Sequence, residues 1–382
     1  MRTSLLVRQR LVGASVLVAL GLLVACGGPG VPTPAACTEP TDLAPIADAA
    51  LADAVREALG ATAGPTCGEL ATLTVLDIQD LGVTTLAGLE HAHALVTLQA
   101  DRNEVDDVTV LAGLSNLRGL WFGGNQVSDI AALAGLTELR GISFWNNPVT
   151  SVAPISGMTQ LTHAYIGDTP ARDHHLLVGL TQLRVLNLNR SGLTNLDFLA
   201  GMTEIEEFHA TWNDELVDAS ALASATKLVR LDLGDTGLTD VAFLSSLPDL
   251  RMVTLWGNPI ADVGPIEALS ALTHLDVGGT GLNDLAFLAN SPDLASLYAW
   301  SNEIADISVL ASLPDLVTVV IPGNALSDIG ALVANAGFAA GAQLNVAGNC
   351  LDVTPGSANR NDIDALVDRG VAVEFEPQRD GC

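Results

Sequence analysis

The stretch LRMVTLWGNPIADVGPIEALSALTHLDVGGTGLNDLAFLANSPD, residues 250–293, contains two copies of one 22-residue pattern. Each copy places apolar residues at its positions 1, 4 and 6, and a small polar residue, Asn258 or Thr280, at position 9. Apolar residues at positions 4 and 6 alternate with outward-facing positions, as they do in a short half-buried strand. One copy is too small to enclose a core, so each copy must stack on the next.

The same pattern continues along most of the chain. Its copies begin at Leu73, Leu95, Leu117, Leu139, Leu161, Leu183, Ile205, Leu228, Leu250, Leu272, Leu294, Leu316 and Gly341. Ten of the twelve intervals are 22 residues; the exceptions are 23 residues after Ile205 and 25 after Leu316. This period and form predict an α/β solenoid for residues 73–349, a leucine-rich repeat horseshoe with a parallel concave sheet and short convex helical or 3-10 turns.

Two polar positions recur in the unit. Position 9 is Asn in eight copies, and a buried Asn there is expected to bond the turn backbone of its own and the next coil. Position 13 is usually Asp, as in Asp107, Asp240 and Asp262. These carboxylates could form a ladder that binds cations. However, each Asp comes just before an apolar segment, and this placement favours a role in capping a short helical turn on the convex side.

Both ends of the repeat are predicted to be caps. Residues 37–72 contain a helix that Asp48 can cap, followed by the capping-box pair Thr66 and Glu69. Residues 350–382 predict a helix, a glycine stop and a last strand. Two cysteines lie near each end, and pairing by neighbourhood gives the disulfides Cys37–Cys67 and Cys350–Cys382. A four-thiolate metal site is the alternative, but it lacks any CxxC pair, so no metal is predicted.

The N-terminus predicts export. Arginines precede an apolar run that is too short for a stable transmembrane span. The run ends in LVAC, residues 23–26, which resembles the lipobox of bacterial lipoproteins. That resemblance implies a signal peptide over residues 1–25, lipidation of Cys26 and, from Gly27, delivery to an outer membrane. An ordinary secretory signal is the alternative. Residues 26–36, rich in Gly and Pro, predict a flexible tether.

The repeat and its helical cap resemble internalin-type bacterial leucine-rich repeat proteins. The resemblance rests on units of the form LxxLxLxxNxIxDIxxLxxLxx and on the cap LADAVREALG, residues 51–60, and it covers Leu43 to Val353. It implies a non-catalytic module that binds other proteins through the concave sheet. The chain lacks the immunoglobulin-like domain and the wall-anchoring motif of Gram-positive internalins, so a role in host invasion is not implied.

Charge and motifs exclude several other functions. The chain has 16 Lys and Arg against 44 Asp and Glu, a net charge of −28, which disfavours nucleic acid and anionic membrane surfaces. Contact with a membrane is therefore expected only through the lipid anchor, and a monomer is expected. The sequence contains no GxSxG, HExxH, P-loop or dinucleotide motif. Asp173, His174 and His175 in RDHHLL predict an exposed convex turn, so neither catalysis nor a cofactor is expected.

The large aromatics point to the binding surface. Strand positions 3, 5 and 7, with position 8 at the strand exit, face the inner curve. The predicted ligand-binding residues are Trp121, Trp145, His163, Tyr165, His209, Trp212, Trp256, His274, Tyr298 and Trp300. Eight of them form two expected neighbourhoods, one that joins Trp121, Trp145, His163 and Tyr165, and another that joins Trp256, His274, Tyr298 and Trp300. Nearby acids, including Asp232 and Asp276, favour a basic ligand. The predicted partner is a protein or peptide. A glycan, a purely structural spacer, or aromatics that only cover one another remain as alternatives.

Overall fold

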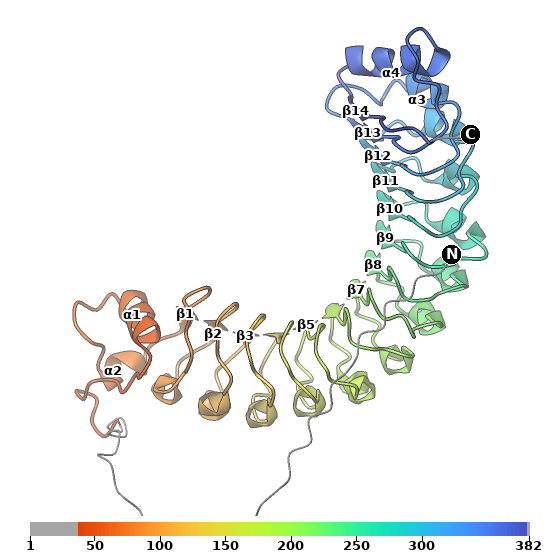
Figure 1. The fold of residues 1–382 in the computed structure, drawn as a ribbon. Coiled ribbons are helices and arrows are strands. Elements are labelled where there is room, and N and C mark those ends of the chain that lie inside the picture. Colours follow the sequence, from red (N-terminus) through yellow and green to blue (C-terminus); the bar gives the residue numbers. More distant parts are fainter. Residues whose placement is uncertain (1–36, 380–382) are drawn as a thin grey trace, which may run out of the picture. The chain divides into compact units, whose positions relative to one another are not determined.

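The computed structural model describes residues 37–379. The predicted signal peptide, the predicted lipidation site Cys26, the whole predicted tether (residues 26–36) and Cys382 lie outside the described residues. Within them, fourteen strands form one sheet in chain order (Figure 1), and every neighbouring pair is parallel. None of the described helices combines the length and apolar composition needed to span a bilayer. The solenoid prediction is confirmed.

Strands β1 to β13 each occupy positions 3–5 of a unit, β14 belongs to the C-terminal cap, and the central residue of each strand is turned into the core. The strands are β1 Val75–Asp77, β2 Thr97–Gln99, β3 Gly119–Trp121, β4 Gly141–Ser143, β5 His163–Tyr165, β6 Val185–Asn187, β7 Glu207–His209, β8 Arg230–Asp232, β9 Met252–Thr254, β10 His274–Asp276, β11 Ser296–Tyr298, β12 Thr318–Val320, β13 Gln343–Asn345 and β14 Ala372–Glu374. Pairing keeps position 4 opposite position 4, as Val253, Leu275 and Leu297 show. The leucines of successive units therefore stack into one continuous core.

Short helical turns form the outer side of the curve, away from the strands (Figure 1). They are η1 Leu89–His91, η2 Thr109–Gly113, η3 Ala131–Leu133, η4 Ala153–Ile155, η5 His174–Gly179, η6 Asp197–Leu199, η7 Ser220–Ser224, η8 Ala242–Ser246, η9 Gly264–Ala268, η10 Ala286–Asn290, η11 Ser308–Ser312 and α3 Gly330–Ala334. Asp240 Oδ1 accepts the Ala242 N–H at 2.7 Å, as the capping prediction requires. For Asp173 the prediction is wrong, because this carboxylate bonds Ser151 and Val152 of the preceding coil.

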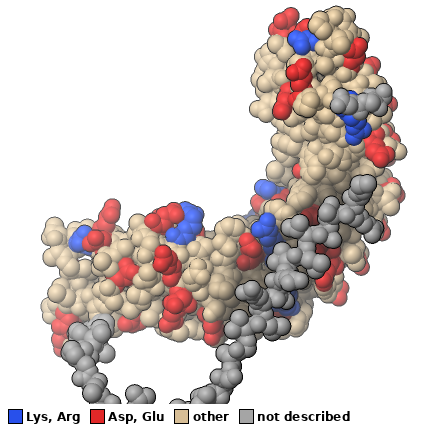
Figure 2. All heavy atoms as spheres, viewed as in Figure 1, with Lys and Arg blue, Asp and Glu red and all other residues tan. Residues whose placement is uncertain are grey.

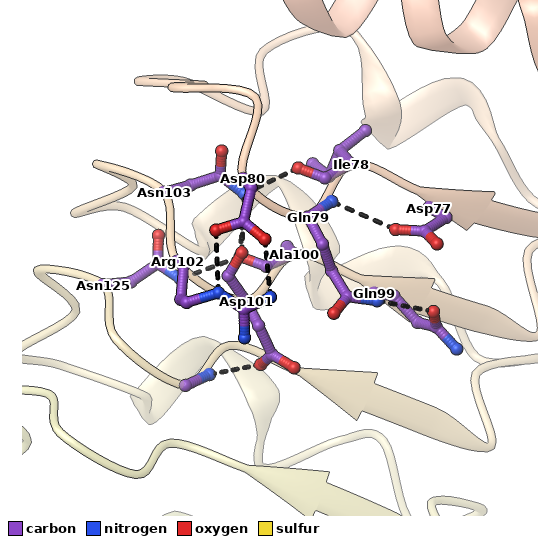
Figure 3. Close-up of polar contacts among 11 residues, drawn as sticks. Asp77, Ile78, Gln79, Asp80, Gln99, Ala100, Asp101, Arg102, Asn103 and Asn125 are labelled. Atoms are coloured by element: carbon purple, nitrogen blue, oxygen red, sulfur yellow. Dashed lines mark hydrogen bonds and ion pairs between the residues drawn. The ribbon is translucent and has the colours of Figure 1, made fainter.

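The asparagines at position 9 are buried and tie coils together, with one correction. Asn103 Nδ2 donates to the Ile78 and Ala100 carbonyls at 2.8 and 2.9 Å, and its Oδ1 accepts the Val83 N–H at 2.9 Å. Asn125 repeats this arrangement one coil later, again reaching the Ala100 carbonyl (Figure 3). Each Asn thus bonds its own and the preceding coil. We expected the next coil, and that direction was wrong.

Position 8, where the chain leaves the strand, is left-handed throughout the repeat. In all thirteen units of the described chain its φ lies between 51° and 73°. Five units place glycine there, while the others hold larger residues such as Arg102 and Trp212. Left-handed backbone is unfavourable for a bulky residue, so the stacked turns impose this conformation on the sequence.

Both caps form as predicted. Helix α1, Ala49–Ala58, begins at Asp48, whose carboxylate accepts from Ala50 and Leu51 and also from Thr84 in the first coil. Helix α2, Cys67–Leu70, has the Thr66 capping box. The disulfide Cys37–Cys67 is present. Helix α4, Ala358–Asp368, precedes β14 at the other end. Cys350 is also disulfide-bonded; its predicted partner, Cys382, lies outside the described residues.

Candidate functional site

Three tryptophans from alternate coils form one aromatic strip along the sheet. Trp212, Trp256 and Trp300 follow β7, β9 and β11, and we call them the tryptophan ladder. Ring centroids lie 5.7 Å apart for Trp212 and Trp256, and 6.4 Å apart for Trp256 and Trp300. The sequence placed Trp256 and Trp300 in one neighbourhood; the structure adds Trp212 to it.

Glycines of the intervening coils make room for the ladder. Gly234 and Gly278 occupy position 7 on the coils of β8 and β10. A Cβ atom at Gly278 would lie 2.1 Å from the Trp300 ring, and one at Gly234 would lie 2.3 Å from the Trp256 ring. Any side chain at these positions would displace an indole. The ladder therefore depends on an alternation of tryptophan and glycine that the repeat frame alone does not require.

Trp212 begins the ladder in a conformation that tryptophan rarely adopts. It occupies position 8 with a φ of 58°. Its side chain is 44% exposed, and the Arg190 guanidinium carbon lies 4.4 Å from its ring centroid. A cation over an indole face is an attractive contact. Because position 8 is left-handed in every unit of the described chain, the distinguishing feature of this coil is the large, partly exposed ring that it carries there.

The other predicted neighbourhood is looser. Trp121 and Tyr165, the last residues of β3 and β5, lie 6.1 Å apart across the coil of β4, where Gly141 and Ser143 are small and buried. Trp145 is 44% exposed and makes no ring contact with another aromatic in the described chain. His163 bonds the Thr162 hydroxyl through Nδ1 at 2.9 Å. Burial raises the pKa of Tyr165, and the charge of Glu207 adds to the effect.

A hollow of about 240 Å³ lies beside the ladder, over β8 to β11. We call it the acidic hollow. It is lined by Arg230, Asp232, Met252, Thr254, His274, Asp276 and Tyr298. The rings of His274 and Tyr298 lie 5.6 Å apart on one side of it. His209 does not line the hollow: it is only 9% exposed, bonds Asp232 through Nδ1 and has Nε2 3.5 Å from Glu207.

The two carboxylates of the hollow differ in their surroundings. Burial acts to raise the pKa of Asp232, but the His209 hydrogen bond and the charges of His209 and Arg230 outweigh it, so this pKa is lowered. Burial also raises the pKa of Asp276, the Gly278 N–H opposes the rise only partly, and the charge of Asp232 adds to it. Burial and the charge of Arg230 lower the pKa of His274. Asp232 therefore has an internal counter-ion, whereas Asp276 lacks one.

The N-terminal end holds a second acidic surface that sequence reasoning missed. A hollow between α1 and β1 is lined by Asp53, Glu57, Asp77 and Asp80, together with exposed Val75 and Leu81. Arg102 reaches back one coil and bonds both oxygens of Asp80 (Figure 3). In the sequence, only the acids at positions 5 and 8 of the first unit could have indicated this surface. They were overlooked because no aromatic residue accompanies them.

Charge is spread widely instead of forming one basic or acidic face. In the view of Figure 2, acidic side chains are scattered over the coils and the few basic ones mostly lie among them. Several cations pair across coils, as in Arg184 with Glu206 and Lys227 with Glu204. Residues 37–379 contain no group of three His, Cys, Asp or Glu side chains arranged to hold a metal ion.

Comparison with known proteins identifies similar structures but no similar curated sequence. No protein-family model matches the chain, and no curated protein matches it. An internalin, InlF, from Listeria monocytogenes is 25% identical, with a TM-score of 0.77, over 87% of this chain and 96% of that one. Internalin C2 of the same species is 29% identical, with a TM-score of 0.54, over 55% of this chain and 94% of its own.

A third similar structure comes from a plant. The leucine-rich repeat ectodomain of the Arabidopsis thaliana receptor kinase GASSHO1/SCHENGEN3, solved in complex with CASPARIAN STRIP INTEGRITY FACTOR 2, is 16% identical, with a TM-score of 0.53. The alignment covers 79% of this chain and 45% of that one. At this identity the likeness concerns the fold alone.

Proposed function

We propose that this internalin-like leucine-rich repeat protein is a non-catalytic binding module whose concave face takes a protein or peptide partner. The tryptophan ladder carries the proposal. Apart from Trp145, position 7 of the other coils is Gly, Asn, Thr, Gln, Asp, Pro or Ala, so the solenoid does not need an indole there. Partly exposed Trp side chains supply large contact area at low entropic cost, and they dominate the energetics of protein interfaces.

The similar structures support a polypeptide ligand. The likeness to the Listeria internalin InlF extends over most of both chains. The plant ectodomain was solved in complex with CASPARIAN STRIP INTEGRITY FACTOR 2, so a leucine-rich repeat fold of this kind can hold such a ligand. Short parallel strands also give a rigid surface on which side chains at positions 3, 5 and 7 are fixed before a partner arrives, which reduces the ordering cost of binding.

Export and membrane attachment are part of the proposal. The disulfide Cys37–Cys67 is typical of an oxidising compartment outside the cytoplasm. We propose that Cys26 carries the lipid anchor, in an outer membrane, and that the monomer contacts the membrane only through it. The net charge of −28 favours such an arrangement over adsorption to anionic lipid or nucleic acid.

Replacing Trp212, Trp256 and Trp300 together with alanine is expected to abolish partner binding. The measurement is chemical cross-linking from the surface of living cells that carry the full chain, with recovered partners quantified by mass spectrometry. We expect at least about a hundredfold weaker binding of the specific partner, because each of the three removed indoles contributes about 1–2 kcal/mol or more at an interface. Replacement of exposed Val178 on the convex side is the matched control. Equal partner recovery by the triple variant and the control would show that the ladder is not the binding surface.

Replacing Gly278 with alanine is a subtler test, because no tryptophan is removed. The new Cβ would force the Trp300 ring away from its position, while the backbone of Gly278 lies outside the left-handed region. We expect weaker partner binding and changed tryptophan fluorescence, with little loss of stability. Gly135→Ala, where a Cβ meets no atom within 4 Å, is the control. Unchanged fluorescence and unchanged binding in Gly278→Ala would contradict the role given to the glycine.

A glycan is the second candidate ligand, since the partly exposed indoles of Trp256 and Trp300 could also stack on sugar rings. Parallel screening of the purified chain on peptide and glycan arrays separates the two ligands. Binding confined to the glycan array would replace the polypeptide proposal. If the protein is only a structural spacer, no ligand should bind on either array, and the tryptophan substitutions should leave partner recovery unchanged.

A further inference from the structure

Asp276 is the centre of the acidic hollow and has an incomplete set of partners. It lies in β10, in register with Thr254 of β9 and Tyr298 of β11. Its Oδ1 accepts the Gly278 N–H at 3.0 Å. Among the described residues its other oxygen makes no hydrogen bond, and no Lys or Arg pairs with the side chain. A carboxylate that is more than half enclosed by protein therefore retains an open acceptor toward the hollow.

The neighbouring base is already engaged. Arg230 also lines the hollow, but its Nη2 lies 3.3 Å from Asp232 Oδ2, and the same oxygen bonds His209. Arg230 of β8 and His209 of β7 therefore both engage Asp232. His274 stands on the β10 side, where burial lowers its pKa, so it is neutral at physiological pH and adds no competing charge. The negative charge of Asp276 is left without a counter-ion.

Aromatic side chains border the same space, and two of them line it. Tyr298 and His274 pack together on one side of it. Trp300 lies over Gly278, the residue whose N–H bonds Asp276, and Trp256 follows Thr254 on the adjacent coil. A carboxylate flanked by aromatic rings is suited to an organic cation, because the ring faces and the carboxylate both attract positive charge.

We propose that the acidic hollow receives one arginine or lysine side chain of the partner, with Asp276 as its counter-ion and Tyr298 and His274 as its walls. The proposal rests on the proposed function and adds to it the chemical identity of the residue that sits beside the tryptophan ladder. A guanidinium or ammonium group there forms the charge-assisted hydrogen bond that Asp276 lacks. The strongly acidic chain also attracts a basic partner from a distance.

The test uses the purified protein and acetylated pentapeptides that differ only at the central residue, which is arginine, lysine, citrulline or norleucine. Citrulline keeps the shape of arginine and removes its charge. We expect the arginine and lysine peptides to bind about tenfold more tightly than the two neutral ones. Asp276→Asn should abolish this preference, while Asp235→Asn, an exposed acid after β8, should leave it unchanged.

A second readout separates binding from folding. Asparagine can still accept the Gly278 N–H, and it removes a charge that lacks a counter-ion, so Asp276→Asn should match or exceed the unmodified protein in Tm while it loses cation preference. Equal binding of arginine and citrulline peptides, or an unchanged preference in Asp276→Asn, overturns the proposal. If the triple tryptophan variant still loses its cross-linked partner in that case, the proposed function stands and only the cation site falls.

Discussion

Replacing Asn258 with alanine is expected to lower the free energy of unfolding by about 3–6 kcal/mol. Asn258 is fully buried, and its Oδ1 accepts from the Leu238 N–H and the Thr236 hydroxyl, both at 2.9 Å. Its Nδ2 donates to the Leu233 carbonyl at 2.7 Å and the Leu255 carbonyl at 2.9 Å. Alanine removes the side-chain partner of three buried backbone groups, the Leu238 N–H, the Thr236 N–H and the Leu255 carbonyl, and each such group costs about 1–3 kcal/mol.

Chemical denaturation followed by circular dichroism measures the effect. Because repeat stacks can unfold in segments, the m-value must be compared along with the midpoint. Asn116→Ala is the control, since Asn116 is exposed and makes a single hydrogen bond, to the His93 carbonyl. A loss in Asn258→Ala no larger than that in Asn116→Ala would mean that the ladder of asparagines does not hold the coils together.

Replacing His174 with leucine is expected to remove an acid-sensitive element of the fold. His174 is 4% exposed at position 14, where other coils carry an apolar residue such as Val152 or Leu196. Within the described chain its Nε2 has no hydrogen-bond partner. Burial lowers its pKa to about 4; the charge of Asp173 opposes this, while the charges of Arg172 and His175 add to it. The prediction of an exposed convex turn was therefore wrong for His174 and right for His175, which is exposed.

The direction of the pH effect follows from the lowered pKa. In the unfolded chain a histidine has a pKa of about 6.5. Between that pH and about pH 4, His174 is therefore protonated in the unfolded state and neutral in the folded state. The contribution of neutral His174 to stability is complete above pH 6.5 and is lost as the pH falls toward 4. The loss amounts to about 3 kcal/mol.

Unfolding free energies of the wild type, His174→Leu and His175→Leu at pH 7 and pH 4 test this expectation. His174→Leu should be more stable than the wild type at pH 7, because an unpartnered ring nitrogen is replaced by apolar packing, and its advantage should grow by about 3 kcal/mol at pH 4. His175→Leu should follow the wild type. An advantage of His174→Leu that stays constant between the two pH values would refute the assignment.

Much of the fold could be predicted because the apolar and polar positions of each unit show which side chains face the core and which face solvent. The thirteen strand registers, the Asp48 and Thr66 caps and the Cys37–Cys67 disulfide depend on spacing along the chain, and spacing is visible in the sequence. The direction in which Asn103 reaches was not predictable in this way. Nothing in a repeated pattern distinguishes the coil before from the coil after; only the handedness and tilt of the stack do so.

The binding surface was also only partly predictable from the sequence. The alternation of strand positions was enough to place Trp212, Trp256 and Trp300 on the inner curve, but not to show that their rings touch over Gly234 and Gly278. Likewise, His209 at position 5 and His274 at position 3 were both expected to face the inner curve, yet His209 is enclosed between Glu207 and Asp232 while His274 lines the hollow.

The sequence by itself thus determined the solenoid, its caps and the face on which a partner is expected, because these follow from a period of 22 residues and from the side to which each position points. Only the tertiary structure decided which side chains remain available. The left-handed turn at Trp212, the seating of indoles on glycine and the missing counter-ion of Asp276 arise between neighbouring coils, and a contact between coils is fixed by the distance and angle at which they stack.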